Sequence, residues 1–140
     1  MNSQMNCSDM PAIREGFHNI NSEATLNSFL ESAEDVNCDL KTPYKASAIM
    51  RKAEYTSWPF KKLSYFKEGK QLLEDFVKSH PNNIEGRYVR LLTQVSLPGF
   101  LNYSDDKEAD YNFINTHIAA SDLPETYKRE ILLTINKIYK

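Results

Sequence analysis

The sequence has few of the residues on which many well-known sites depend. Only 4 glycines and 6 prolines occur in 140 residues, which excludes a glycine-rich phosphate loop and a collagen-like repeat. No run of about 18 apolar residues is present, so we expect no transmembrane helix. The first residues, MNSQMNCSDMPAIREGF, contain neither the basic nor the apolar part of a secretory signal. We therefore expect a cytoplasmic location by default.

Cysteine is also scarce. Cys7 and Cys38 stand 31 residues apart and do not form a CxxC pair. Two free thiols fit a cytoplasmic protein, whereas a single bridge would tie the N-terminal residues to the rest of the chain. Between these two interpretations we expect the free thiols.

Metal-binding and catalytic patterns are missing. The histidines are His18, His80 and His117. They are scattered and form neither HxxxH nor HExxH, so no metal ligand is predicted. No GxSxG is present, and neither cysteine has an adjacent histidine pattern. No catalytic residue and no cofactor are predicted, and an enzyme is not the favoured interpretation.

A cluster of acidic residues comes late in the chain. Its members are Asp105, Asp106, Glu108 and Asp110. The cluster lacks the glycine and the terminal glutamate of a calcium loop. We expect these acids to cap a helix and to interact favourably with its N-terminal dipole.

The charges are unevenly distributed, although the formal net charge is only −2. Residues 1–43 carry 7 acidic and 2 basic side chains, while residues 44–70 carry 7 basic and 2 acidic ones. Such segments can pair with each other in the folded chain, or the basic one can meet an external anion. Internal pairing is the interpretation we favour.

What the sequence does contain is a strong helical pattern. Hydrophobic residues make up 41% and charged residues 26%, which is typical of a folded domain. Apolar positions recur at helical spacing between proline and cap signals. Helices are predicted near residues 10–18, 22–36, 42–55, 59–80, 83–96, 105–120 and 124–138. We predict an all-α fold of six or seven helices in antiparallel hairpins, with residues 1–9 as a flexible arm and 10–140 as a single helical domain.

Two local signals carry specific expectations. Thr42-Pro43 combines a cap residue with proline at the first helical position, so a helix should begin there. Gly69 lies inside the helix of residues 59–80, where glycine costs about 1 kcal/mol relative to alanine. Close approach of another helix would explain it. The apolar face expected to be buried on that helix consists of Leu63, Phe66, Leu73, Phe76 and Val77.

Residues 72–85, LLEDFVKSHPNNIE, resemble the joint between tetratricopeptide repeats, where a second helix ends in a Pro/Asn turn. Gly69, Leu73 and Phe76 stand where that repeat places small and large packing residues. Residues 43–114 also resemble a family of small helical bacterial proteins without an assigned activity, at Trp58 to Phe66 and at Arg87 to Leu91. Both resemblances imply a tetratricopeptide-like helical array, and neither implies a reaction.

Several polar residues are candidates for binding. They are Lys45, Lys52, Lys62, Arg87, Arg90 and Gln94, with Tyr44 and Tyr65 as aromatic contacts. The lysines can line a groove for an anion or pair with acidic residues of the first third. The arginines and Gln94 share a helix stripe that can hold a carboxylate, or can fix the apolar loop of residues 100–103 through its carbonyls. That loop is expected to lie against the core.

Aromatic and basic residues also alternate between Trp58 and Lys67. Such mixing can bind nucleic acid, but aromatics on a helix face are usually core residues, and the sequence pI near 5.9 argues against a nucleic-acid partner.

The leading hypothesis is a non-enzymatic helical module that binds a protein or peptide. The alternative is a small-anion binder or an unrecognised enzyme with a basic pocket. A third is a structural oligomer, if residues 131–139 expose an apolar patch.

Overall fold

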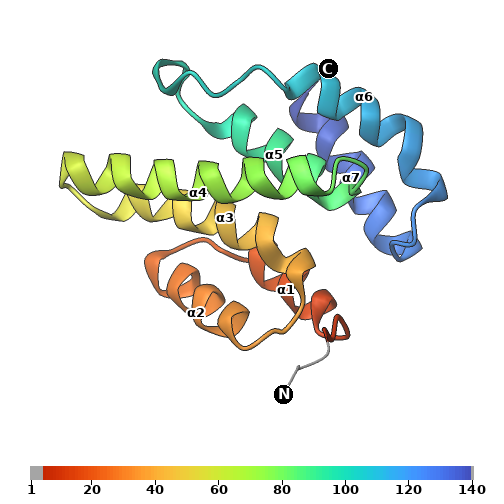
Figure 1. Ribbon diagram of the computed structural model, residues 1–140, viewed down its shortest axis with the longest axis horizontal. Helices are drawn as coiled ribbons and strands as arrows, with labels where there is room; N and C mark the ends of the chain where they lie inside the picture. Colours follow the sequence, from red (N-terminus) through yellow and green to blue (C-terminus); the bar gives the residue numbers. More distant parts are fainter. Residues whose placement is uncertain (1–4, 140) are drawn as a thin grey trace. The chain divides into compact units, whose positions relative to one another are not determined.

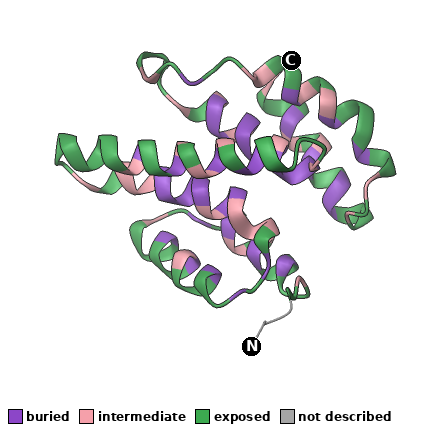
Figure 2. Ribbon diagram, viewed as in Figure 1, coloured by how far each residue is buried: buried purple, intermediate pink, exposed green. Residues whose placement is uncertain are grey.

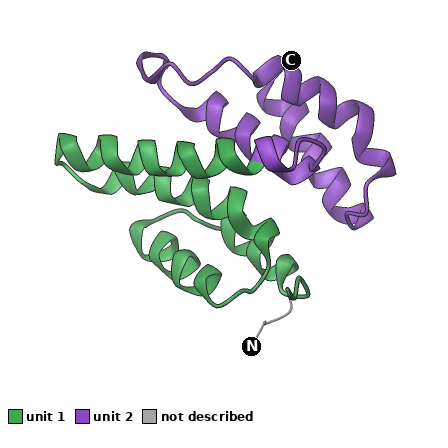
Figure 3. Cartoon of the chain, viewed as in Figure 1, with its two compact units in different colours: residues 1–76 green, residues 77–140 purple. Residues whose placement is uncertain are grey.

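A computed structural model describes residues 5–139, and within that range it contains seven α-helices and no strand. The prediction of an all-α fold is confirmed. The chain divides into two compact units, residues 1–76 and residues 77–140, and each is described by itself (Figure 3). The antiparallel hairpin arrangement and the single domain over residues 10–140 stay predictions.

Unit 1 contains the first three helices and most of the fourth (Figure 1). Two short 3₁₀ turns, η1 (Asp39–Lys41) and η2 (Lys52–Tyr55), lie before and after α3. The helices are α1 (Met10–His18), α2 (Glu23–Glu34), α3 (Thr42–Arg51) and α4 (Pro59–Ser79), the last of which ends in unit 2.

Local sequence signals explain where these helices begin. The Ser22 hydroxyl accepts a hydrogen bond from the Thr25 backbone N–H at 3.1 Å, and the Ser22 N–H donates to the Thr25 hydroxyl at 3.0 Å. This reciprocal cap satisfies N–H groups that a helix start leaves unpaired. The predicted Thr42 cap is wrong, because η1 leads directly into α3 and places Thr42 inside the helix.

Aromatic side chains from three helices meet in the core of unit 1. The Phe17 ring of α1 stands edge-on to Phe29 of α2 and to Tyr44 of α3, with centroid separations of 6.2 and 5.1 Å. All three are buried, and Tyr44 is fully so. Edge-to-face aromatic pairs add about 0.5–1.5 kcal/mol to the free energy gained by burial.

Gly69 marks a close contact between α3 and α4. A Cβ atom built on Gly69 would lie 2.5 Å from the carbonyl oxygen of Ala46 and 2.5 Å from Cγ of Met50. The expectation that another helix approaches Gly69 is confirmed. Only glycine allows this spacing, since any side chain would meet the backbone of α3.

Replacing Gly69 with alanine is expected to destabilise the protein, although alanine is the better helix former. Separating α3 from α4 should cost about 1–3 kcal/mol net, which urea unfolding followed by circular dichroism would measure. Gly99→Ala is the matched control, because its added Cβ meets nothing within 4 Å. If Gly69→Ala were as stable as the wild type, the close contact would not exist in solution.

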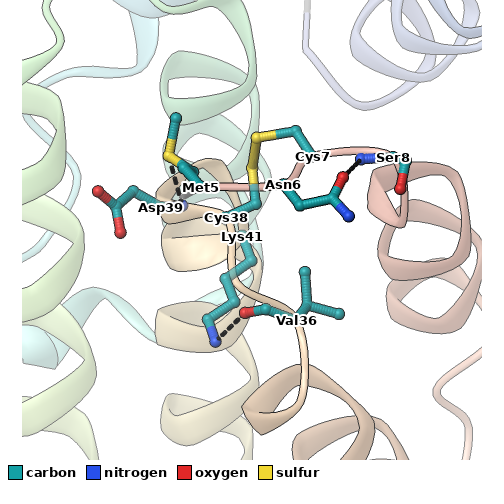
Figure 4. The surroundings of a disulfide bond; sticks show 8 residues. All are labelled: Met5, Asn6, Cys7, Ser8, Val36, Cys38, Asp39 and Lys41. Atoms are coloured by element: carbon teal, nitrogen blue, oxygen red, sulfur yellow. Dashed lines mark hydrogen bonds between the residues drawn. A yellow bond between two sulfur atoms is a disulfide. The ribbon is translucent and has the colours of Figure 1, made fainter. Parts of the chain in front are cut away.

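A disulfide joins Cys7 to Cys38 (Figure 4). The expectation of free thiols is therefore wrong. The two Cα atoms lie 5.0 Å apart, because the backbone N–H of Asn6 donates to the Asn37 carbonyl at 2.7 Å and brings the two segments together. Of the arm predicted over residues 1–9, residues 1–4 lie outside the described residues, and this bridge ties part of the remainder to the start of η1.

Lys41 provides a second tie close to the disulfide. Its ammonium group donates to the carbonyls of Ala33 and Val36, both at 2.7 Å (Figure 4 shows the second bond). A lysine side chain at this place binds two carbonyls at and just after the C-terminal end of α2, where cations also interact favourably with the helix dipole.

Unit 2 contains the last three helices. They are α5 (Ile84–Ser96), α6 (Lys107–His117) and α7 (Glu125–Ile138), with the 3₁₀ turns η3 (Gly99–Leu101) and η4 (Ile118–Ala120) between them. The side-chain carbonyl of Asn83 caps α5 by accepting from the Gly86 N–H at 2.8 Å. Within residues 5–139, no helix combines the length and apolar character needed to cross a membrane.

The apolar face of α5 lies in the core of unit 2 together with residues of α6 and α7 (Figure 2). Tyr88 and Leu91 are fully buried, and Tyr88 stands edge-on to Tyr127 at 6.3 Å. Burial raises the pKa of the Tyr88 hydroxyl to about 12. The loop before α6 lies only partly against this core, since Tyr103 is buried but Phe100 is 84% exposed.

Candidate functional site

The basic residues predicted to bind are divided between the two units. In unit 1, the Lys45 ammonium lies 2.7 Å from the Glu34 carboxylate and holds the pKa of Glu34 below its usual value. The Lys62 ammonium donates to the Ala53 carbonyl at 2.9 Å, which satisfies a backbone acceptor in η2. Pairing of Lys45 with an acid of the first third agrees with the interpretation favoured from the sequence.

The two predicted aromatic contacts occupy different environments in unit 1. Tyr44 is fully buried, so its ring has no surface to offer a partner. Tyr65 is half-buried and lies under the ammonium group of Lys52, which is 5.2 Å from the ring centroid. A cation over an aromatic face at this distance stabilises the side chains by about 0.5–1 kcal/mol.

In unit 2, Arg87 and Arg90 converge on one buried carboxylate. Nε and Nη2 of Arg90 donate to the two oxygens of Asp110 at 2.8 Å each, and Nη1 of Arg87 donates to Asp110 at 3.1 Å. Asp110 is completely buried and Arg90 is 6% exposed. A forked arginine–carboxylate pair of this kind fixes α5 to α6 with defined geometry.

Gln94 forms a second link between α5 and the start of α6. Its amide donates to the Asp106 carboxylate at 2.9 Å and accepts from the Asp106 N–H at 3.0 Å. The Arg87 guanidinium also lies over the Phe113 ring, 4.5 Å from its centroid. The side chains of Arg90 and Gln94, predicted to hold an external carboxylate, therefore bind carboxylates of the same unit. Its predicted role at the carbonyls of residues 100–103 stays a prediction.

The acidic cluster does not cap α6 as predicted. The Asp106 side chain makes no capping bond, and it binds Gln94 while Asp110 binds the arginines. A basic and an acidic stripe could have revealed this pairing, because Arg87 and Arg90 recur along one helix and Asp106 and Asp110 along the start of the next. Among the described residues, every buried side-chain nitrogen or oxygen has a hydrogen-bond partner.

The first turns of α4 expose the apolar residues that the sequence assigned to the core. Phe60 is 86% exposed, Trp58 67% and Leu63 44%. Of the five residues predicted to form the buried face of this helix, Leu63 is the exception. The other four are buried as predicted, namely Phe66, Leu73, Phe76 and Val77. Leu63 lies on the outward edge of the helix arc, where Figure 2 shows the first turns of α4 exposed.

An open, shallow surface lies on this part of α4. Its lining residues are Phe60, Leu63, Ser64, Lys67 and Glu68, which we call the α4 face. Their spacing of i, i+3, i+4, i+7 and i+8 places all five on one side of the helix. Lys61 and Lys67 have no ion pair and no hydrogen bond through their ammonium groups among the described residues, unlike Lys45 and Lys62.

Residues 5–139 contain no group of three or more His, Cys, Asp or Glu side chains placed to hold a metal ion. The α4 face combines two exposed apolar side chains, Phe60 and Leu63, with one lysine and one glutamate, Lys67 and Glu68. Comparisons with protein-family models, with curated proteins and with solved structures found no match to this chain.

Proposed function

We propose that this chain is a non-enzymatic interaction module whose α4 face binds a segment of another protein. The observation that carries the proposal is the exposure of Phe60 on the α4 face, because 86% of its surface is open to water. Burying such a side chain contributes about 1.5–3 kcal/mol. A single aromatic anchor of that strength is typical of the centre of a protein interface.

The eight residues predicted from the sequence lie outside the α4 face. Those with internal partners, such as Lys45 and Arg90, hold their helices in place. The resemblance of residues 72–85 to a tetratricopeptide joint supports the same functional class, because helical hairpin arrays commonly bind peptides. The α4 face differs from those residues in presenting apolar area that no internal contact covers.

The test compares two phenylalanines of nearly equal exposure. Phe60 is 86% exposed on α4 and Phe100 is 84% exposed in η3. Wild type, Phe60→Ser and Phe100→Ser would each be used to capture proteins from a native lysate, with mass spectrometry of what is retained. We expect a protein that wild type and Phe100→Ser both retain and that Phe60→Ser loses by at least tenfold, since about 1.4 kcal/mol corresponds to a factor of ten.

Neither substitution should change the fold, because an exposed side chain away from the core alters stability by about 0.5 kcal/mol or less. Circular dichroism of the three proteins would verify this. Equal retention by wild type and Phe60→Ser would disprove the proposal for the α4 face. A protein lost by both variants would also count against it.

A further inference from the structure

We propose that Cys7 is a modification site for small thiol compounds, and that Cys38 is the resolving thiol which restores the disulfide. The proposal is independent of the α4 face and comes from an asymmetry between the two cysteines. Cys38 is buried, with 2% of its surface exposed, whereas Cys7 is partly exposed. An attacking thiolate has to reach one sulfur atom of a disulfide, so access decides which of the two it attacks.

Cys7 belongs to a surface segment, residues 5–8, which we call the N-terminal strap (Figure 4). The other three residues of the strap are exposed. The Asn6 N–H donates to the Asn37 carbonyl at 2.7 Å and holds the strap against the residue that precedes Cys38. Cys7 is therefore the half of the bridge that a dissolved reagent meets first.

The exchange step replaces one disulfide by another. An external thiolate attacks the Cys7 sulfur, a new S–S bond forms between them, and the Cys7–Cys38 bond breaks. The electron pair of the broken bond leaves with the Cys38 sulfur, which takes a proton from water. The products are a mixed disulfide on Cys7 and a free thiol at Cys38, with no net oxidation or reduction.

Cys38 is well placed to reverse this step. The Cα atoms of the two cysteines lie 5.0 Å apart, and the Asn6–Asn37 hydrogen bond is a separate tie between the same two segments. A nucleophile held near its target reacts faster than the same groups on separate molecules. The Cys38 thiolate therefore attacks the Cys7 sulfur, re-forms the bridge and expels the small thiol.

The helices of unit 1 are held by contacts outside the strap. Phe17, Phe29 and Tyr44 form the aromatic core, and the Lys41 ammonium group ties the end of α2. Opening of the bridge should therefore free the strap locally, while α1, α2 and α3 stay folded in the absence of denaturant. Cys7 is then a reversible site on a folded chain.

The first experiment maps the adduct on the full chain. Wild type would be incubated with reduced glutathione, quenched with acid to stop exchange, digested with pepsin at acid pH and analysed by mass spectrometry without reductant. We expect glutathione on Cys7 and none on Cys38, with an unchanged circular dichroism spectrum. Equal labelling of both cysteines, no adduct on either, or loss of the helical signal would each overturn the proposal.

Two single variants test access to each sulfur without the disulfide. Cys38→Ser leaves Cys7 as a free thiol, and Cys7→Ser leaves Cys38. Each would be treated with oxidised glutathione, which transfers one glutathionyl group to a thiolate and releases reduced glutathione. We expect Cys38→Ser to be labelled and Cys7→Ser to stay unlabelled, because Cys38 is buried. Labelling of both variants at the same rate, or of neither, would contradict the assigned roles.

The last measurement tests Cys38 as the resolving thiol. Glutathione-treated wild type would be desalted to remove the small thiol, and its adduct would be followed over time. We expect the Cys7 adduct to disappear and the bridge to return without an added oxidant. The matched control is labelled Cys38→Ser, which has no second thiol and should keep its adduct. An adduct that persists equally in both proteins would disprove the resolving role of Cys38.

Discussion

Asp110→Ala is expected to lower the free energy of unfolding by about 3–5 kcal/mol, the range for removing one partner of a buried ion pair. Asp110 is fully buried and accepts three hydrogen bonds from two arginines. Without it, the Arg90 guanidinium stays buried and loses its main charge partner. The cost comes mainly from that uncompensated charge, and urea unfolding of the full chain would measure it.

Two further variants sharpen this prediction. Asp105→Ala removes a neighbouring exposed carboxylate and should change stability by about 0.5 kcal/mol or less. Arg90→Met/Asp110→Leu removes both charges together and should recover a large part of the stability that Asp110→Ala loses, because apolar replacement of a buried pair is often neutral. Wild-type stability in Asp110→Ala would contradict the buried pairing of α5 and α6.

Reducing the Cys7–Cys38 disulfide is expected to destabilise the chain by about 4 kcal/mol. The bridge joins residues 31 apart in the sequence. In the chain-entropy description, a loop of that size restricts the unfolded chain by about 3.5–4 kcal/mol at 25 °C. Reduction removes that restriction, and urea unfolding with and without dithiothreitol would show a lower midpoint in the reductant.

The control for this prediction is Cys7→Ser/Cys38→Ser. The double variant should unfold at the lower midpoint and should not respond to the reductant. Free-thiol titration of the native protein gives an independent check, since the structure predicts no reactive thiol without reduction. If the urea midpoint of the wild type were the same with and without dithiothreitol, the bridge would be absent in solution.

The sequence predicts the helices of this protein well because their signals are local. The reciprocal cap at Ser22 and the cap at Asn83 depend on residues within three positions of each helix start. The apolar spacing and the prolines depend on one or two turns. Thr42 is a partial exception, because the helix begins there as predicted but η1 precedes it, so Thr42 lies inside the helix and does not cap it. Gly69 also carried long-range information, since its cost in a helix predicted the close approach of another helix, which the structure identifies as α3.

The candidate site was harder to predict because charge and apolar character do not say what a side chain faces. The Arg87 and Arg90 stripe looked suited to an external carboxylate, yet Asp110, 20 residues from Arg90, supplies that carboxylate internally. Leu63 looked like a core residue by helical spacing, and Phe60 by being an aromatic residue on a helix, yet both are exposed. The sequence pattern gives the face of a helix but not whether a neighbour covers it.

The sequence by itself determined the fold class and the approximate helix bounds, because backbone hydrogen bonding and capping act over a few residues. Only the tertiary structure decided three things: that Cys7 meets Cys38, that the charges of α5 and α6 satisfy each other, and that Phe60 stays in water. Each depends on which segments, distant in the chain, come within a few ångströms. That is a property of packing, which no local pattern encodes.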